Sequence, residues 1–513
     1  MKKFTFLFLL IFAFPVMLSA QEISTEDFRS KVRDYRAQNE SQIIDELVTF
    51  LSIPNVTSDV ENIQRNAEHI KGMLEKRGIS ARIMETGGRP VVFGELNVPG
   101  ATTTIMFYAH YDGQPVDLSK WIDQDPFEPV LRKSKMEAGS TTPKPVPFPR
   151  IGKYEDDWRI YARSASDDRC PITAILAGMD AVKSMGLNFG SNLKFIFEGE
   201  EETSSPNLRS FSINNREMIA ADVLYVCDGP VYYNNKPTLK FGARGITTIN
   251  LTVYGPNTNV HSGHYGNWVP NPGMKLSKLL AGMKDEVGNV LVEGFYDTSA
   301  PLGSIEKQAL RDIPPFDGHL MELYGFSEPE GGGKSLMELI NRPSLNIRGM
   351  QSAWIGSQAR TVVPTEATAA IDIRMVKGNE PSDMVNKVKK HIEQQGYYVT
   401  SREPNQETRM KYPNIARVTG GGGYPASRTE MDLPISKKTI DALEKYFGEK
   451  PVLIPTSGGS VPLYIFTRDL ELPTISVPIV NHDNNQHQAN ENIRIGHYYT
   501  GIETFAAILY YVR

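Results

Sequence analysis

Apolar residues follow two patterns that alternate along the chain, one typical of helices and one typical of strands. Apolar positions at helical spacing predict helices over Ile23–Ser52, Ala67–Arg77 and Pro171–Met185. Short apolar runs bounded by Gly and Pro predict strands at Pro90–Leu96, Thr102–Ala109, Leu193–Phe197 and Asp222–Val226. Strands that alternate with helices are typical of a three-layer α/β domain with a central, mainly parallel sheet.

A change of pattern at Gly245 predicts a second domain. The segments GITTINLTVYG and EATAAIDIRMV alternate apolar and polar positions, and a helix is predicted after them over Pro381–Gln395. The middle of this region, Pro301–Gly333, is rich in Gly and Pro and gives little helix or strand signal. We therefore expect a smaller α/β domain inserted into the first, which divides the chain into residues 21–242, 243–404 and 405–513.

The N-terminus has the layout of a secretory signal. Lys2 and Lys3 precede an apolar run, Phe4–Leu18, that closes on small residues and is followed by a polar one. We interpret residues 1–20 as a signal peptide cleaved after Ala20, which predicts a secreted or periplasmic protein. An uncleaved membrane anchor is the alternative, but the run is short for a hydrocarbon core of ~30 Å. No later stretch predicts a stable membrane span.

Composition excludes several classes of protein. The chain has 513 residues and a net charge of -5, and it lacks the dense stripe of Lys and Arg that nucleic-acid binding needs. Its two cysteines, Cys170 and Cys227, cannot form a disulfide scaffold. A hydrophobic fraction of 40% is ordinary for a globular protein.

Acidic and histidine clusters lie directly after the predicted strands. One cluster is His110-Tyr111-Asp112, and others are the run EGEEE from Glu198 and the single Asp228. Alone, each is more often a solvated loop, a turn or a helix cap, and the pair Asp167-Asp168 before a helix is such a case. Ligands of open α/β sheets bind beyond the carboxyl ends of the strands, so these side chains can converge there. The segment with His482, Asp483 and His487 also follows an apolar run.

Gathered carboxylates repel one another, and a divalent cation relieves that repulsion. Mixed His and Asp or Glu ligands suit Zn²⁺ or Mn²⁺, whereas the lack of thiolates argues against a structural zinc site. The number of residues matches two ions that share a bridging carboxylate. The residue types therefore predict a two-metal site, with Zn²⁺ favoured and Mn²⁺ or Co²⁺ as alternatives.

The order of the motifs resembles a known family. The motifs are HYDGQP, ARSASDDRC, FEGEEETSSP, YVCDG, VHSGHYG, IDIRMV, SGGSVP and HQANENI. They resemble the dinuclear zinc peptidases that include aminoacylase, carnosinase-type dipeptidases and the carboxypeptidase G group, and they span nearly the whole mature chain. The resemblance implies a catalytic α/β domain with an inserted lid domain, and a homodimer formed through the lid.

The resemblance also implies roles for individual residues. His110 and Asp228 would bind one metal, Glu202 and His487 the other, and Asp167 would bridge both, with a cis bond before Asp168. Glu201 would be the general base, and Asp112 would orient His110. In the lid, His261 would stabilise the oxyanion, often at the site of the partner subunit. The substrate carboxylate would bind Arg374, and the backbone at Gly459 and Ser460 would contact substrate.

Two features depart from the family pattern. Arg169 and Cys170 follow the Asp-Asp pair, where family members have Lys and Gly. A stretch rich in Pro, Ser and Thr, at about residues 133–158, predicts an excursion between the first two motifs.

Several functions remain open at this stage. The resemblance favours a dipeptidase, because in the family aspartate at the position of Asp228 and a long insertion go with that activity. In such an enzyme a metal-bridging water attacks the peptide bond and Glu201 takes up its proton. The alternatives within the family are an N-acyl amino acid deacylase and a carboxypeptidase. Two further hypotheses involve no catalysis. The protein would be either a non-catalytic metal-binding secreted protein or a secreted structural protein that binds calcium on its surface. The calcium hypothesis requires His110 and His487 to lie far apart.

Overall fold

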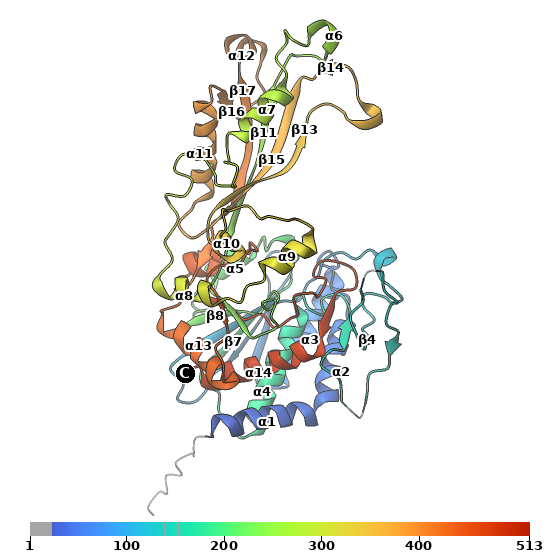
Figure 1. The fold of residues 1–513 in the computed structure, drawn as a ribbon. Helices are drawn as coiled ribbons and strands as arrows, with labels where there is room; N and C mark the ends of the chain where they lie inside the picture. The colour runs from blue at the N-terminus through green and yellow to red at the C-terminus, as the bar shows by residue number, and fades with distance from the viewer. Residues whose placement is uncertain (1–22, 138, 151–152) are drawn as a thin grey trace, which may run out of the picture.

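The computed structural model describes residues 23–137, 139–150 and 153–513, so the predicted signal peptide lies outside the described residues. Figure 1 shows two bodies, a larger one that contains both ends of the described chain and a smaller one above it. Each is built on its own sheet, as the change of pattern at Gly245 predicts. In the described part of the chain, no helix is long and apolar enough to cross a membrane.

The larger sheet has eight strands, and its centre is parallel. Their order is β1-β2-β7-β3-β8-β20-β9-β19, with β7, β3, β8 and β20 parallel to one another. The outer pairs β1–β2, β2–β7 and β9–β20 are antiparallel. The strands are β1 (Ser80–Met84), β2 (Val91–Leu96), β3 (Thr104–His110), β7 (Asn192–Glu198), β8 (Val223–Val226), β9 (Thr238–Lys240), β19 (Val452–Ile454) and β20 (Thr474–Ser476).

Apolar side chains on both faces of this sheet explain its three layers. In β3, Ile105 and Phe107 belong to the core on one face, while Met106 and Tyr108 belong to the core on the other. The first core is closed by α1 (Thr25–Gln38), α2 (Glu40–Leu51), α3 (Val60–Glu75), α4 (Arg169–Ser184), α13 (Pro434–Phe447) and α14 (Ile495–Tyr511). The second is closed by α5 (Leu208–Asn214) and the π-helical segment Ile465–Asp469.

The single helix expected over Ile23–Ser52 is two helices. The first ends at Asn39, whose side chain donates a hydrogen bond to the carbonyl of Tyr35. Asparagine satisfies backbone groups at helix ends better than it supports a helix interior, so the break lies there.

The smaller sheet has five strands in the order β13-β15-β11-β17-β16. All neighbours are antiparallel except β16 and β17. The helices α7 (Pro272–Ala281) and α11 (Pro381–Gln394) pack on one face of this sheet. The strands are β11 (Gly245–Tyr254), β13 (Ser344–Gln351), β15 (Glu366–Met375), β16 (Tyr398–Thr400) and β17 (Ile415–Tyr424). At one edge, β13 is largely exposed.

The sheet pairing moves the predicted boundary at residue 404. Strand β17 was expected in the second part of the larger domain, yet it pairs with β11 and β16. Its GGGGY run lacks alternating side chains, so the sequence carries no strand signal there. We propose that the inserted domain extends to about Tyr424. It would then include α12 (Gln406–Lys411), which lies between β16 and β17.

The middle of the insertion returns to the larger domain. Within Pro301–Gly333, where little structure was predicted, the chain forms α8 (Ser304–Asp312) and α9 (Asp317–Tyr324), and α10 (Leu336–Ile340) follows. Helix α8 packs on β19, and Phe316 and Met337 pack against buried Tyr232 and Ile454. In Figure 1 these helices lie between the two bodies. This segment therefore packs on the larger domain beside its sheet.

The remaining elements are short. The predicted excursion contributes to a four-stranded sheet of β4 (Val130–Arg132), β5 (Pro145–Val146), β6 (Arg159–Tyr161) and β21 (Asn492–Arg494). Two small ladders pair β10 (Gly242–Ala243) with β18 (Ser427–Arg428) and β12 (Val260–His261) with β14 (Val362–Val363). Cys170 and Cys227 are buried free thiols.

Candidate metal centre

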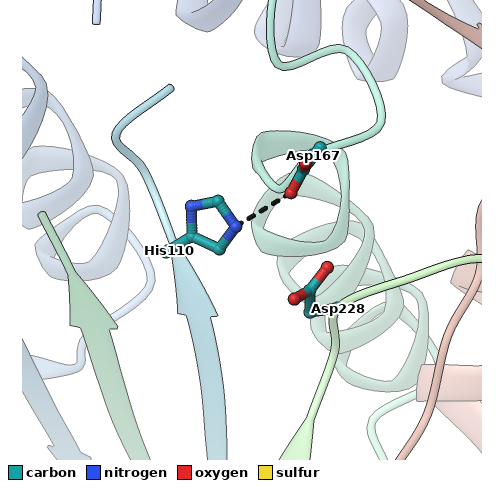
Figure 2. Close-up of side chains that lie close together, drawn as sticks. All are labelled: His110, Asp167 and Asp228. Atoms are coloured by element: carbon teal, nitrogen blue, oxygen red, sulfur yellow. Dashed lines mark hydrogen bonds and ion pairs between the residues drawn. The ribbon is translucent and has the colours of Figure 1, made fainter. Parts of the chain in front are cut away.

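Three side chains from distant segments meet at the carboxyl edge of the larger sheet. His110 is the last residue of β3, Asp228 follows β8, and Asp167 lies in the loop before α4. Figure 2 shows their side chains pointing toward one another, with His110 Nε2 2.9 Å from Asp167 Oδ1. One ligand atom from each residue lies within 4.8 Å of those of the other two, which is close enough to hold one metal ion.

A second triad shares Asp167. The other carboxylate oxygen of Asp167, Oδ2, lies 3.0 Å from His487 Nε2. The same nitrogen is 3.3 Å from Glu202 Oε2, and the three ligand atoms again lie within 4.8 Å of one another. Two potential metal sites that share one carboxylate make a dinuclear arrangement. The five ligands expected from the sequence are therefore brought together.

The electrostatics of the cluster fit divalent cations. Burial, together with the neighbouring Asp167, raises the pKa of Asp228. Burial and nearby carboxylates also raise the pKa of Glu201 and Glu202. Among the described residues, the buried Asp228 Oδ1 has no hydrogen-bond partner. Repelling carboxylates and an unsatisfied buried oxygen are the surroundings that a bound cation would stabilise.

Asp167 behaves differently from the other acids. Burial disfavours its charged form, but hydrogen bonds with His110 and His487 outweigh burial and lower its pKa. A carboxylate that stays ionised between two imidazoles is suited to bridging two cations.

Asp112 contacts four neighbouring residues at once. Its Oδ1 lies 3.4 Å from His110 Nδ1 and accepts a hydrogen bond from the backbone N–H of Glu201 at 3.1 Å. Its Oδ2 accepts from the backbone N–H of Glu202 and from the hydroxyl of Thr57. Asp112 is fully buried, so its contacts hold the ring of His110 and the start of the acidic run in one arrangement.

Glu201 lies beside the triads without belonging to either. Its Oε2 is 3.9 Å from His110 Nε2. Its raised pKa makes the carboxylate a better proton acceptor than an exposed glutamate. Position and basicity are both compatible with the predicted role of general base.

Glu491 holds the loop of Asp167 and was missed by the sequence reasoning. Its carboxylate accepts hydrogen bonds from the backbone N–H groups of Ser164, Ser166 and Asp167, at 2.9 to 3.0 Å. It also forms a buried ion pair with Arg163 at 2.7 Å. The loop contains the cis peptide bond Asp167–Asp168, which the resemblance implies. The signal for Glu491 was its place in HQANENI, four residues after His487.

The departure at Arg169 has a structural explanation. Its buried guanidinium donates hydrogen bonds to the backbone carbonyls of Phe50 and Ile53 and, from Nε, to that of Tyr111. Arg169 therefore joins the start of α4 to the end of α2 and to the HYD motif. Beside it, Cys170 is buried in the core.

Arg374 and Ser460 are brought together from the two bodies of the molecule. Arg374 Nη1 donates to Ser460 Oγ at 2.7 Å, and its Nε donates to Asp372 at 3.1 Å. Tyr424, another residue that the sequence reasoning missed, donates its hydroxyl to the carbonyl of Ser460 at 2.8 Å. The carbonyl of Gly459 accepts from the backbone N–H of Arg244. A partly exposed guanidinium beside a hydroxyl can bind a carboxylate.

His261 lies away from the metal cluster of its own chain. It is exposed, its Nδ1 accepts a hydrogen bond from the backbone N–H of Gly263, and its ring packs on His264. Figure 1 shows α6 (Ser262–Tyr265), which follows it directly, at the far end of the smaller body from the larger sheet. Within one chain, the structure does not bring this predicted residue to the site.

The calcium hypothesis is wrong for this geometry. It requires His110 and His487 to lie far apart, whereas both lie at about hydrogen-bond distance from Asp167, at 2.9 and 3.0 Å.

Comparison with known proteins supports the family resemblance found in the sequence. The model of the family described as peptidase family M20/M25/M40 matches residues 106–511. The Cys-Gly metallodipeptidase of Schizosaccharomyces pombe is 26% identical over 491 residues, covering 91% of this chain and 95% of that protein. The Beta-Ala-His dipeptidase of Mus musculus is 26% identical and covers 82% of this chain and 79% of that protein.

A solved structure shares the fold over nearly the whole chain. The M20 family metallo-carboxypeptidase Sso-CP2 from Sulfolobus solfataricus is 28% identical, with a TM-score of 0.68. The match covers 91% of this chain and 98% of that protein.

The comparison corrects one prediction, the secreted or periplasmic location. The yeast Cys-Gly metallodipeptidases, which align over 91% and 92% of this chain, are cytosolic-type enzymes. The prediction of a signal peptide rests only on the composition of the apolar run after Lys3. That run lies outside the described residues.

Proposed function

The chain belongs to the peptidase family M20/M25/M40, and on that premise we propose that it hydrolyses dipeptides or short peptides, with Glu201 as general base. As a metallopeptidase of this family it has a dinuclear metal centre, for which zinc is typical. One observation carries the assignment of the centre to particular residues: the two potential metal triads share Asp167. The similar curated proteins, which are dipeptidases by name, support the choice of substrate.

The ligands follow from the two triads. His110 and Asp228 would hold one ion, Glu202 and His487 the other, and Asp167 both. When bound, such ions acidify a water molecule and polarise the carbonyl of the scissile bond. Zn²⁺ suits this set of carboxylates and imidazoles, as do Mn²⁺ and Co²⁺.

Glu201 and Asp112 supply the proton handling and its geometry. The Glu201 carboxylate accepts the proton of the attacking water and passes it to the nitrogen of the leaving amine. Asp112 keeps Glu201 in place through the backbone N–H of that residue, at 3.1 Å. Asp112 also contacts the ring of His110, so it holds the general base Glu201 and the metal ligand His110 in a fixed position relative to each other.

Arg374 would anchor the substrate. Its guanidinium can form a forked pair of hydrogen bonds with the carboxylate of a dipeptide, beside the hydroxyl of Ser460 and the backbone at Gly459. A free carboxylate on the leaving side is common to dipeptides, N-acyl amino acids and carboxypeptidase substrates, so this contact alone does not select among them.

We also propose a homodimer formed through the smaller domain. Strand β13 is an exposed sheet edge, and Trp268 and Ile355 are 81% and 87% exposed on the same domain. A dimer through this surface would cover these side chains. It would also allow His261 of one protomer to stabilise the oxyanion at the other protomer's site.

A substrate screen tests the proposal. Protein reconstituted with metal is offered Cys-Gly, β-Ala-His, N-acetyl amino acids and longer peptides with a free carboxyl end, and released amino acids are quantified. We expect the dipeptides to be cleaved with the highest kcat/KM. Cleavage of N-acetyl amino acids alone would identify a deacylase, and stepwise removal of C-terminal residues from the longer peptides a carboxypeptidase. If protein with two bound metals cleaves nothing, it is a non-catalytic metal-binding protein.

A further inference from the structure

A lysine that no predicted role uses lies beside the metal centre. Lys240 is the last residue of β9 and is partly buried. A Cβ placed on Gly229 would lie 3.4 Å from Lys240 Nζ, so the ammonium stands beside the residue that follows Asp228. Among the described residues, no hydrogen bond or ion pair is formed by this ammonium. The opposite charge that faces it is the carboxylate of Asp228, which would be bound to a metal ion when the site is filled. Burial costs a charged amine free energy, so a lysine kept there suggests a ligand that supplies a second carboxylate.

Lys240 lines a cavity of about 420 Å³ that begins at the metal centre. Asp228 and Gly229 form one end of its wall, and Gly458 and Gly459 line it as well. The volume is within the range of small-molecule sites. The cavity therefore runs from the metal ligands to the stretch that precedes Ser460.

The other walls of the cavity are mostly apolar. Tyr232 and Tyr233 contribute aromatic surface, and Met337 and Ile340 reach it from the returning segment of the insertion. His482 adds a second polar group, because its Nδ1 is buried and has no hydrogen-bond partner in the described part of the chain. An apolar pocket whose walls carry two groups able to donate hydrogen bonds, Lys240 and His482, selects a side chain that has an apolar stem and a polar end.

The position of the cavity indicates which half of the substrate it receives. Arg374 and Tyr424, which surround the hydroxyl and carbonyl of Ser460, do not line the cavity. If the substrate carboxylate binds Arg374, the leaving residue lies on that side of the metals. The cavity beside Asp228 then takes the residue on the acyl side of the scissile bond.

We propose that Lys240 is a specificity-determining residue, which makes this enzyme prefer substrates whose acyl-side residue carries a side-chain carboxylate. This inference rests on the proposed peptidase function and narrows its substrate class to dipeptides that begin with an acidic residue. The carboxylate would accept a charge-assisted hydrogen bond from Lys240, with His482 as a second donor.

The test compares two substrates that match in shape and differ in charge. Glu-Ala and Gln-Ala are assayed with the metal-reconstituted enzyme, and kcat/KM is measured for each. The wild-type protein should prefer Glu-Ala by about tenfold or more, because a hydrogen bond between charged groups contributes that much to binding. Lys240→Met should reduce the ratio of the two constants to about one, and Lys240→Arg should retain the preference.

Lys236→Met is the matched control. Lys236 lies four residues before Lys240 and forms an exposed ion pair with Glu449. Its removal takes away the same charge outside the cavity, so the ratio should stay at the wild-type value. Metal content is measured for every variant, since a change in bound metal would alter both substrates together.

Two results would overturn the inference while the proposed function stands. One is a wild-type enzyme that cleaves both dipeptides without preference, which needs no variant to be observed. The other is a Lys240→Met protein that loses activity on both substrates by the same factor, because Lys240 would then act on the metal ligands. If two metals are bound and no dipeptide is cleaved, the proposed function fails and this inference fails with it.

Discussion

At the scale of single residues, Glu201 is distinguished from the proposed metal ligands by its position. It stands 3.9 Å from His110 and outside both triads. Glu201→Gln should therefore keep two metals and lower kcat by about 10²- to 10⁴-fold, since proton transfer contributes in that range. Turnover and metal content are measured on the same sample, by dipeptide assay and elemental analysis.

His110→Ala is the matched variant, because it removes a predicted ligand instead of the base. It should lose bound metal as well as activity. A Glu201→Gln protein that keeps its turnover would show that another group accepts the proton.

At the scale of elements, the loop between β6 and α4 depends on Glu491. Three backbone N–H groups and Arg163 all point at this one buried carboxylate. Glu491→Gln puts an amide donor among these donors and removes the charge that Arg163 faces. We expect it to cost about 2 kcal/mol or more of stability and to weaken metal binding, because Asp167 lies on the same loop.

Thermal unfolding with and without metal tests this expectation for Glu491. Glu61→Gln, on the exposed face of α3, is the control and should change neither quantity. An unchanged metal affinity in Glu491→Gln would mean that the loop keeps its shape without the carboxylate.

The proposed action of His261 at the site of the partner protomer can be tested with mixed dimers. If His261 acts at the partner's site, co-expressed Glu201→Gln and His261→Ala chains should complement each other. About a quarter of wild-type activity is expected, since about half of the dimers are mixed and each carries one complete site. Activity of the mixture is compared with that of each variant alone. A mixture no more active than the His261→Ala protein would contradict action in trans.

At the scale of the whole molecule, the metal centre joins segments that are hundreds of residues apart. Removal of metal by a chelator should lower the melting temperature, because the ions bind the folded protein alone. At free metal about 1,000 times Kd, each site contributes about 4 kcal/mol. Calorimetry of metal-free and reconstituted protein measures the shift, and His110→Ala should show a smaller one. Equal melting temperatures in the wild type would exclude a centre coupled to folding.

By itself, the sequence determined the local elements and the candidate ligands. Periodicity placed β3, β7, β8 and β11 within two residues of their ends, because side-chain burial on a sheet repeats along the chain. It failed at β17, where glycines carry no pattern, and in the middle of the insertion, where short helices gain stability from packing on the larger domain. The N-terminal run predicted a location that the comparison corrected.

The tertiary structure alone decided how these parts meet. His110, Glu202 and Asp228 lie in the two triads that share Asp167 because the parallel strands β3, β7 and β8 end at the same edge of the sheet, which no spacing along the chain expresses. Glu491 and Lys240 became visible only through their surroundings, the first by the donors that face it and the second by the cavity it lines. Residue type sets the chemistry that a site can perform, whereas contacts between distant segments set which residues share it.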